Sequence, residues 1–215
     1  SQDHNQADGS VYIWGNYSKT SGTDYWSYAT DFDGTSLSGG SERAVSVRFA
    51  ANATATITNA YLQMIGGGLS ASTTIDYQGS GTYGLIINGT TTLNASYYTI
   101  RNINAAGLQI AGTPTITSLD NGDFLLQTNG GTTITVAGSA IDANPAKLIY
   151  SSRFATSTGV TSGFNVTATG TTATFWKFTS TTGAFAGEAY DNDPGGDPGY
   201  ILLDDSNNTI TISGN

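Results

Sequence analysis

Short apolar runs alternate with Gly, Thr, Ser and Asn along most of the chain, and one phrase of this pattern recurs. The first copy covers residues 84–90 (GLIINGT) and the second covers residues 107–113 (GLQIAGT). Weaker copies follow at residues 134–139 (ITVAGS) and 163–168 (GFNVTA), where the closing glycine slips to Gly170. Such recurrence is typical of solenoids, in which each repeat buries its apolar face by stacking on its neighbours.

From about residue 54 to residue 182 the pattern predicts short strands and almost no helix. The predicted strands cover residues 55–57, 61–65, 74–77, 85–87, 97–100, 108–110, 115–116, 124–127, 133–136, 148–150, 164–167 and 174–178. Their short connections leave no room for the crossover helices of βαβ units, so a parallel β-helix and an antiparallel sandwich remain. The glycines recur after roughly 20 to 30 residues, about one coil, and this period favours the all-β parallel β-helix.

The first part of the chain has a different character. Residues 11–14 and 45–49 alternate like half-buried strands, and aromatic residues gather between them. We therefore predict an N-terminal arm or cap over residues 1–50 and a β-helix over residues 51–215, because the end of a solenoid must be covered. The same aromatic cluster is also consistent with a carbohydrate-stacking platform, with the candidate residues Trp14, Tyr25, Trp26 and Tyr28.

Composition and charge narrow the function classes. Sixteen acidic residues against seven basic ones give a net charge of -9, which argues against nucleic acid as a partner and favours cations. The chain has no cysteine, and no apolar run reaches the length of a membrane span. The low lysine content and the richness in Ser, Thr and Asn favour a secreted, cell-surface protein, for which Ser1 is expected to be the mature N-terminus.

The stretch from residue 84 to residue 124, GLIINGTTTLNASYYTIRNINAAGLQIAGTPTITSLDNGDF, resembles a known family. It is similar to the right-handed parallel β-helix of pectate-lyase-like domains, above all to the non-enzymatic repeat modules of large bacterial and archaeal surface proteins. The later stretch FWKFTSTTGAFAGEAYDNDPGGDPGYILLDDS resembles the end of such modules. The resemblance implies a fold and a cell-surface setting, and it implies no particular chemistry.

An acidic loop over residues 188–205 is the sharpest local signal. Asp191, Asp193 and Asp197 match the first, third and seventh positions of a calcium loop, but Leu202 replaces the glutamate expected at the twelfth. One interpretation is a Ca²⁺ site, and the other is a solvated acidic turn. The candidate metal ligands are Glu188, Asp191, Asn192, Asp193, Asp197, Asp204 and Asp205.

Catalytic residues are harder to find. The resemblance implies that lyases of this fold use a basic residue beside calcium-binding acids, and the candidates for that residue are Arg101, Lys147 and Arg153. A hydrolase needs two carboxylates in one cleft, for which Asp120 with Asp123 and the adjacent Asp204 and Asp205 are candidates. The single histidine, His4, lies near the N-terminus, so we predict that the chain is not an enzyme.

Sites for N-linked sugar are numerous. Six asparagines satisfy the N-x-S/T pattern, namely Asn16, Asn52, Asn88, Asn94, Asn165 and Asn207. Asn88 and Asn94 are alternatively expected to stack in ladders at the turns of the coil.

The C-terminal segment contains two more predicted strands, at residues 200–203 and 209–212, with no evident cap after them. A bare strand edge invites self-association. Our first hypothesis is an extracellular structural protein that assembles head-to-tail into a filament or surface layer and is stabilised by Ca²⁺. A carbohydrate-binding or adhesive surface module is the second hypothesis, and a polysaccharide lyase or hydrolase is the third.

Overall fold

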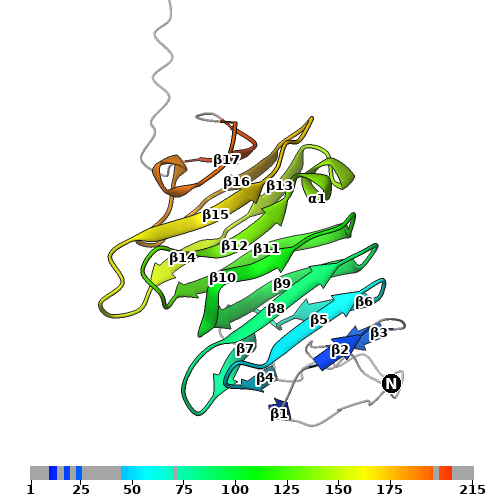
Figure 1. The fold of residues 1–215 in the computed structure, drawn as a ribbon, viewed down its shortest axis with the longest axis vertical. Coiled ribbons are helices and arrows are strands. Elements are labelled where there is room, and N and C mark those ends of the chain that lie inside the picture. Colours follow the sequence, from blue (N-terminus) through cyan, green and yellow to red (C-terminus); the bar gives the residue numbers. More distant parts are fainter. Residues whose placement is uncertain are drawn as a thin grey trace, which may run out of the picture.

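The computed structural model describes the strands at residues 10–13, 17–19 and 23–25, and then residues 45–69, 72–195 and 199–204. All strand pairs in these residues are parallel, and they form sheets of eight, six and three strands. Figure 1 shows the strands stacked coil upon coil, from β1, β2 and β3 at one end to β17 at the other. The prediction of an all-β parallel solenoid is therefore confirmed.

Each coil contributes strands to three sides, which we call side 1, side 2 and side 3. Side 1 contains β3 (Thr23–Tyr25), β6 (Tyr61–Ile65), the first halves of β9 (Thr92–Arg101) and β11 (Thr115–Leu126), β13 (Lys147–Tyr150), β16 (Trp176–Thr179) and β17 (Ile201–Leu203). Side 2 contains β1 (Ser10–Ile13), β4 (Val45–Ala50), β7 (Thr73–Gln78), the second halves of β9 and β11, and β14 (Arg153–Thr156). Side 3 contains β2 (Tyr17–Lys19), β5 (Thr54–Thr58), β8 (Tyr83–Asn88), β10 (Ile103–Ile110), β12 (Gly131–Ala137) and β15 (Gly163–Thr169).

The described strands of the predicted N-terminal arm belong to these same sides. β1, β2 and β3 pair with β4, β5 and β6, and β4 pairs in turn with β7. β1, β2 and β3 therefore form the first described coil of the solenoid in the same chain, and β4 begins the second.

The four copies of the repeated phrase stack on side 3. Leu85 is in register with Leu108, Leu108 with Ile134, and Ile134 with Val166, and all four side chains are completely buried. The last step is slightly longer than the predicted period because α1 (Gly138–Ala143) is inserted between β12 and β13. In the described residues, α1 and the 3-10 helix η1 (Glu188–Tyr190) are the only helices, as the sequence predicted.

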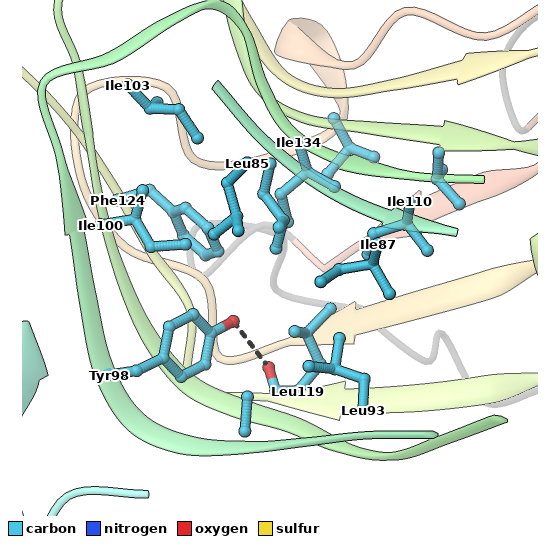
Figure 2. Packing of buried hydrophobic residues seen from close by; sticks show 14 of the residues in the cluster. Leu85, Ile87, Leu93, Tyr98, Ile100, Ile103, Ile110, Leu119, Phe124 and Ile134 are labelled. Carbon is cyan, nitrogen blue, oxygen red and sulfur yellow. Dashed lines mark hydrogen bonds between the residues drawn. The ribbon is translucent and has the colours of Figure 1, made fainter. Parts of the chain in front are cut away.

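Aromatic rings fill the interior between side 1 and side 2. Tyr98, Phe124, Phe154 and Phe178 follow one another through the coils, with centroid separations of 5.6, 5.7 and 5.9 Å. Figure 2 shows the Tyr98 ring among apolar side chains, with its hydroxyl donating to the carbonyl of Leu119 at 3.3 Å. A Cβ at Gly122 would lie 2.5 Å from that hydroxyl, so the glycine makes room for the Tyr98 ring of the preceding coil.

Candidate functional site

The corner between side 1 and side 2 is built from single residues in the left-handed conformation. Tyr97, Asn121, Ser151 and Ser180 have φ values of 52°, 53°, 56° and 57°, and the strand register places them above one another in successive coils. One left-handed residue turns the chain sharply and needs no loop. In the preceding coil, the described residues between β6 and β7 at this corner are residues 66–69 and residue 72.

A groove of about 400 Å³ lies along this corner. It is lined by Leu69, Ser72, Tyr97, Tyr98, Thr99, Asn121, Gly122, Asp123, Ser151, Arg153, Ser180 and Thr182. The hydroxyl groups of Ser72 and Thr99 are hydrogen bonded at 3.0 Å, which holds Ser72 against side 2. Leu69, which lies between β6 and β7, is 85% exposed, so the groove has an apolar rim at its N-terminal end.

An ion pair in the groove joins two adjacent coils. The guanidinium of Arg153 donates to Oδ2 of Asp123 at 2.8 Å, and this hydrogen bond raises the pKa of Arg153. The Arg153 side chain remains 51% exposed. Within the described part of the chain, the buried Oδ1 of Asp123 accepts no hydrogen bond. Exposed ion pairs add little to stability, so this pair matters more for the polar groups that it presents in the groove.

The acidic loop has a structural role at the end of side 1. The N–H of Trp176 donates to the carbonyl of Tyr200 (2.9 Å), and the N–H of Asp204 donates to the carbonyl of Phe178 (3.0 Å). The backbone groups of residues 200 and 204 thus point toward β16. Since alternate residues of a parallel strand bond to opposite neighbours, the backbone N–H groups of Ile201 and Leu203 point away from β16.

A carboxylate accepts a hydrogen bond from each of the two outward N–H groups, those of Ile201 and Leu203. Oδ2 of Asp193 accepts from the N–H of Ile201 at 2.8 Å and from that of Tyr200 at 2.5 Å. Oε2 of Glu188 accepts from the N–H of Leu203 at 2.6 Å. The outward N–H groups of β17 are therefore occupied, a role of the acidic residues that the sequence analysis missed. The second predicted C-terminal strand, residues 209–212, lies outside the described residues.

The remaining predicted metal ligands do not gather around one point in the described structure. Asn192 continues side 3 through its backbone. Its N–H donates to the carbonyl of Val166 at 2.9 Å, and its carbonyl accepts from the N–H of Ala168 at 2.9 Å. Asp191 follows η1, and Asp204 is exposed beyond β17. Asp197 and Asp205 lie outside the described residues. Among the residues that are described, no group of three or more His, Cys, Asp and Glu side chains is placed to hold a metal ion.

Four of the candidate catalytic residues, Lys147, Arg153, Asp120 and Asp123, hold neighbouring coils together. Nζ of Lys147 donates to the carbonyls of Ile116 (2.6 Å) and Thr117 (3.0 Å), and burial lowers the pKa of this amine. Oδ1 of Asp120 accepts from the N–H of Tyr150 at 2.8 Å, whereas Asp123 is paired with Arg153. Arg101 is exposed at the end of β9.

Of the predicted sugar-stacking residues, Tyr25 is the last residue of β3. Trp14, Trp26 and Tyr28 lie outside the described residues. β3 belongs to side 1 and the next described strand, β4, belongs to side 2.

The predicted glycosylation sites differ in access. Asn52 is exposed with a φ of 60°, and Asn88 and Asn94 are partly buried. Asn165 is completely buried, and its amide nitrogen donates to the carbonyls of Phe185 and Gly187 at 2.9 Å each, so the folded chain leaves no room for a sugar there. Asn16 and Asn207 lie outside the described residues.

Other asparagines link the coils. Oδ1 of Asn59 accepts from the N–H of Thr90 at 2.9 Å, and Oδ1 of Asn129 accepts from that of Thr161 at 2.8 Å. The side chain of Asn88 instead accepts from the N–H of the next residue, Gly89, at 2.7 Å.

No protein-family model matches the chain, and neither a curated protein nor a solved structure matches it. The helices in the described part are too short and too polar to cross a bilayer.

Proposed function

We propose that the chain is an extracellular glycan-binding module whose ligand lies in the groove between side 1 and side 2. The observation that carries this proposal is the placement of an aromatic side chain, Tyr97, beside an amide and an ion pair in one groove of about 400 Å³. Ligand sites combine apolar surface with a few polar groups that fix orientation. The ring of Tyr97 offers a face for the C–H groups of a sugar, and Asn121, Asp123 and Arg153 offer partners for its hydroxyl groups.

The shape of the groove favours an extended ligand. The same corner recurs in each successive coil, so polar groups follow the axis of the solenoid. We therefore propose an oligosaccharide chain that lies along the axis. This oligosaccharide is uncharged, because the guanidinium of Arg153 is already paired with Asp123 and is not free to bind an anionic sugar. The net charge of -9 also repels polyanions.

Binding of soluble hexasaccharides tests the proposal. Isothermal titration of the wild-type protein with cellohexaose, xylohexaose and mannohexaose is expected to reveal saturable binding to at least one of them. Tyr97→Ala is expected to weaken that binding by at least tenfold. Tyr150→Ala is a matched control, since Tyr150 is 49% exposed on side 1 and does not line the groove. No binding to any of the three sugars, or equal binding by both variants, would contradict the proposal.

Head-to-tail assembly is a second candidate function, and one observation favours it. β3 and β17 are the first and last described strands of side 1, and both run in the same sense. A second copy placed on the same axis would continue the column once the carboxylates of Glu188 and Asp193 leave the edge of β17. Electron micrographs of the purified chain with calcium and then with a chelator test this function, and filaments that shorten on chelation would support it together with a Ca²⁺ site in the acidic loop.

A further inference from the structure

We propose that Glu188 and Asp193 protect the C-terminal edge of the solenoid, and that this edge, when uncovered, binds the N-terminal strands of a second copy of this chain. The inference concerns the end of the solenoid and is independent of glycan binding at the corner.

The edge of β17 would otherwise be a template for another strand. An edge strand presents a row of N–H and C=O groups, and natural proteins cover such rows or place charges on them. Here the outward N–H groups of Ile201 and Leu203 are each bonded to a carboxylate, at 2.8 and 2.6 Å. Each carboxylate takes the place of an incoming carbonyl and adds a negative charge there.

The local sequence holds both carboxylates in place. Oδ1 of Asp193 accepts from the N–H of Gly195 at 2.9 Å, which fixes the side chain in its turn. A Cβ at Gly199 would overlap the carboxylate of Asp193, so glycine lets the chain pass close to this carboxylate without displacing it. Glu188 begins η1, and the ring of Tyr190 in that helix packs on Phe185 with centroids 4.9 Å apart.

The matching of the two ends indicates a second copy as the occupant. The last coil ends with Thr182 on side 2, Asn192 on side 3 and β17 on side 1. The first described coil begins with β1, β2 and β3 on those same sides, all parallel to the strands above them. A copy in the same orientation therefore places each of its first strands on the matching side, and such a head-to-tail contact continues into a chain of molecules.

Light scattering during size-exclusion chromatography tests the proposal. The double variant Glu188→Ala/Asp193→Ala is expected to associate at least tenfold more tightly than the wild-type protein. The matched control is Asp120→Ala/Asp142→Ala. It removes the same charge and two carboxylates that also accept backbone N–H bonds at 2.8 Å, but from Tyr150 and Ala173 and not from β17. A folded edge variant that stays monomeric, or a control that associates equally, would overturn the proposal.

Hydrogen exchange of the wild-type protein provides a second test that needs no variant. The amides of Ile201 and Leu203 are expected to exchange as slowly as the amide of Leu202, which faces β16. Exchange of both amides at the rate of exposed loop residues would overturn the proposal, even if the edge variant fails to fold.

Discussion

Gly107 opens the second copy of the repeated phrase, and its replacement by alanine should be unusually costly. Its φ is 65°, and it lies where the register between β8 and β10 shifts. A Cβ at this position would lie 2.5 Å from the carbonyl oxygen of Thr132 and even closer to that of Thr133. These are backbone atoms of β12 in the next coil, so they cannot turn aside as a side chain can.

The expected loss has two sources. A non-glycine residue in the left-handed region costs about 1–2 kcal/mol. Overpacking of a close contact costs about 1–3 kcal/mol more. We therefore expect Gly107→Ala to lower the free energy of unfolding by about 3 kcal/mol, measured by urea denaturation and followed by the fluorescence of the buried Trp176.

Gly84 supplies the matched control because it opens the first copy of the same phrase. A Cβ there would meet side-chain atoms, Oγ1 of Thr54 at 3.1 Å and Nδ2 of Asn104 at 3.3 Å, and its φ is not positive. Gly84→Ala is therefore expected to change the free energy of unfolding by less than about 1 kcal/mol. Equal losses in the two variants, or a loss below 1 kcal/mol for Gly107→Ala, would refute this reasoning.

Two further predictions concern buried polar groups. Asn165→Ala leaves the carbonyls of Phe185 and Gly187 without their hydrogen-bond donor. It should lower the free energy of unfolding, measured by urea denaturation, by about 3 kcal/mol. Asn94→Ala loses a single hydrogen bond of 3.4 Å and should lower it much less. Burial, with a smaller contribution from Asp76 and Asp120 respectively, raises the pKa of Tyr83 and of Tyr98. The folded chain therefore retains protons that the unfolded chain loses near pH 10, so the contribution of these two tyrosines to the free energy of unfolding is constant below that pH and falls above it. The fall should be shallower in Tyr83→Phe/Tyr98→Phe, and an equal fall in that variant would contradict the assignment.

The period of the apolar phrase was enough to predict the architecture. Leu85, Leu108 and Ile134 recur at the length of a coil, and this recurrence is a direct consequence of their stacking on side 3. β14 was missed because it is only four residues long and directly follows Tyr150, Ser151 and Ser152, which resemble the end of the preceding strand and a turn. Local patterns of alternation cannot distinguish a new strand from an extended tail of that length.

The groove could not be predicted in the same way. Tyr97, Asn121, Ser151 and Ser180 share a backbone conformation and no residue type, so their alignment depends on the register between coils. The acidic loop produced the opposite difficulty. The spacing of the aspartates in this loop suggested a cation site. Glu188 and Asp193 instead accept hydrogen bonds from backbone N–H groups of β17, which lies further along the chain. Carboxylates placed just before a terminal strand are the signal that would have indicated edge protection.

The most direct test of the central claim, that the corner between side 1 and side 2 binds a glycan, is nuclear magnetic resonance of the labelled wild-type protein. Backbone amide shifts are recorded while the hexasaccharide that binds in the calorimetric assay is added. The proposal predicts that the largest shifts fall on Tyr97, Asn121, Ser151 and Ser180, one residue from each successive coil. Shifts that cluster on side 3 or at the C-terminal edge, with this corner unchanged, would contradict it.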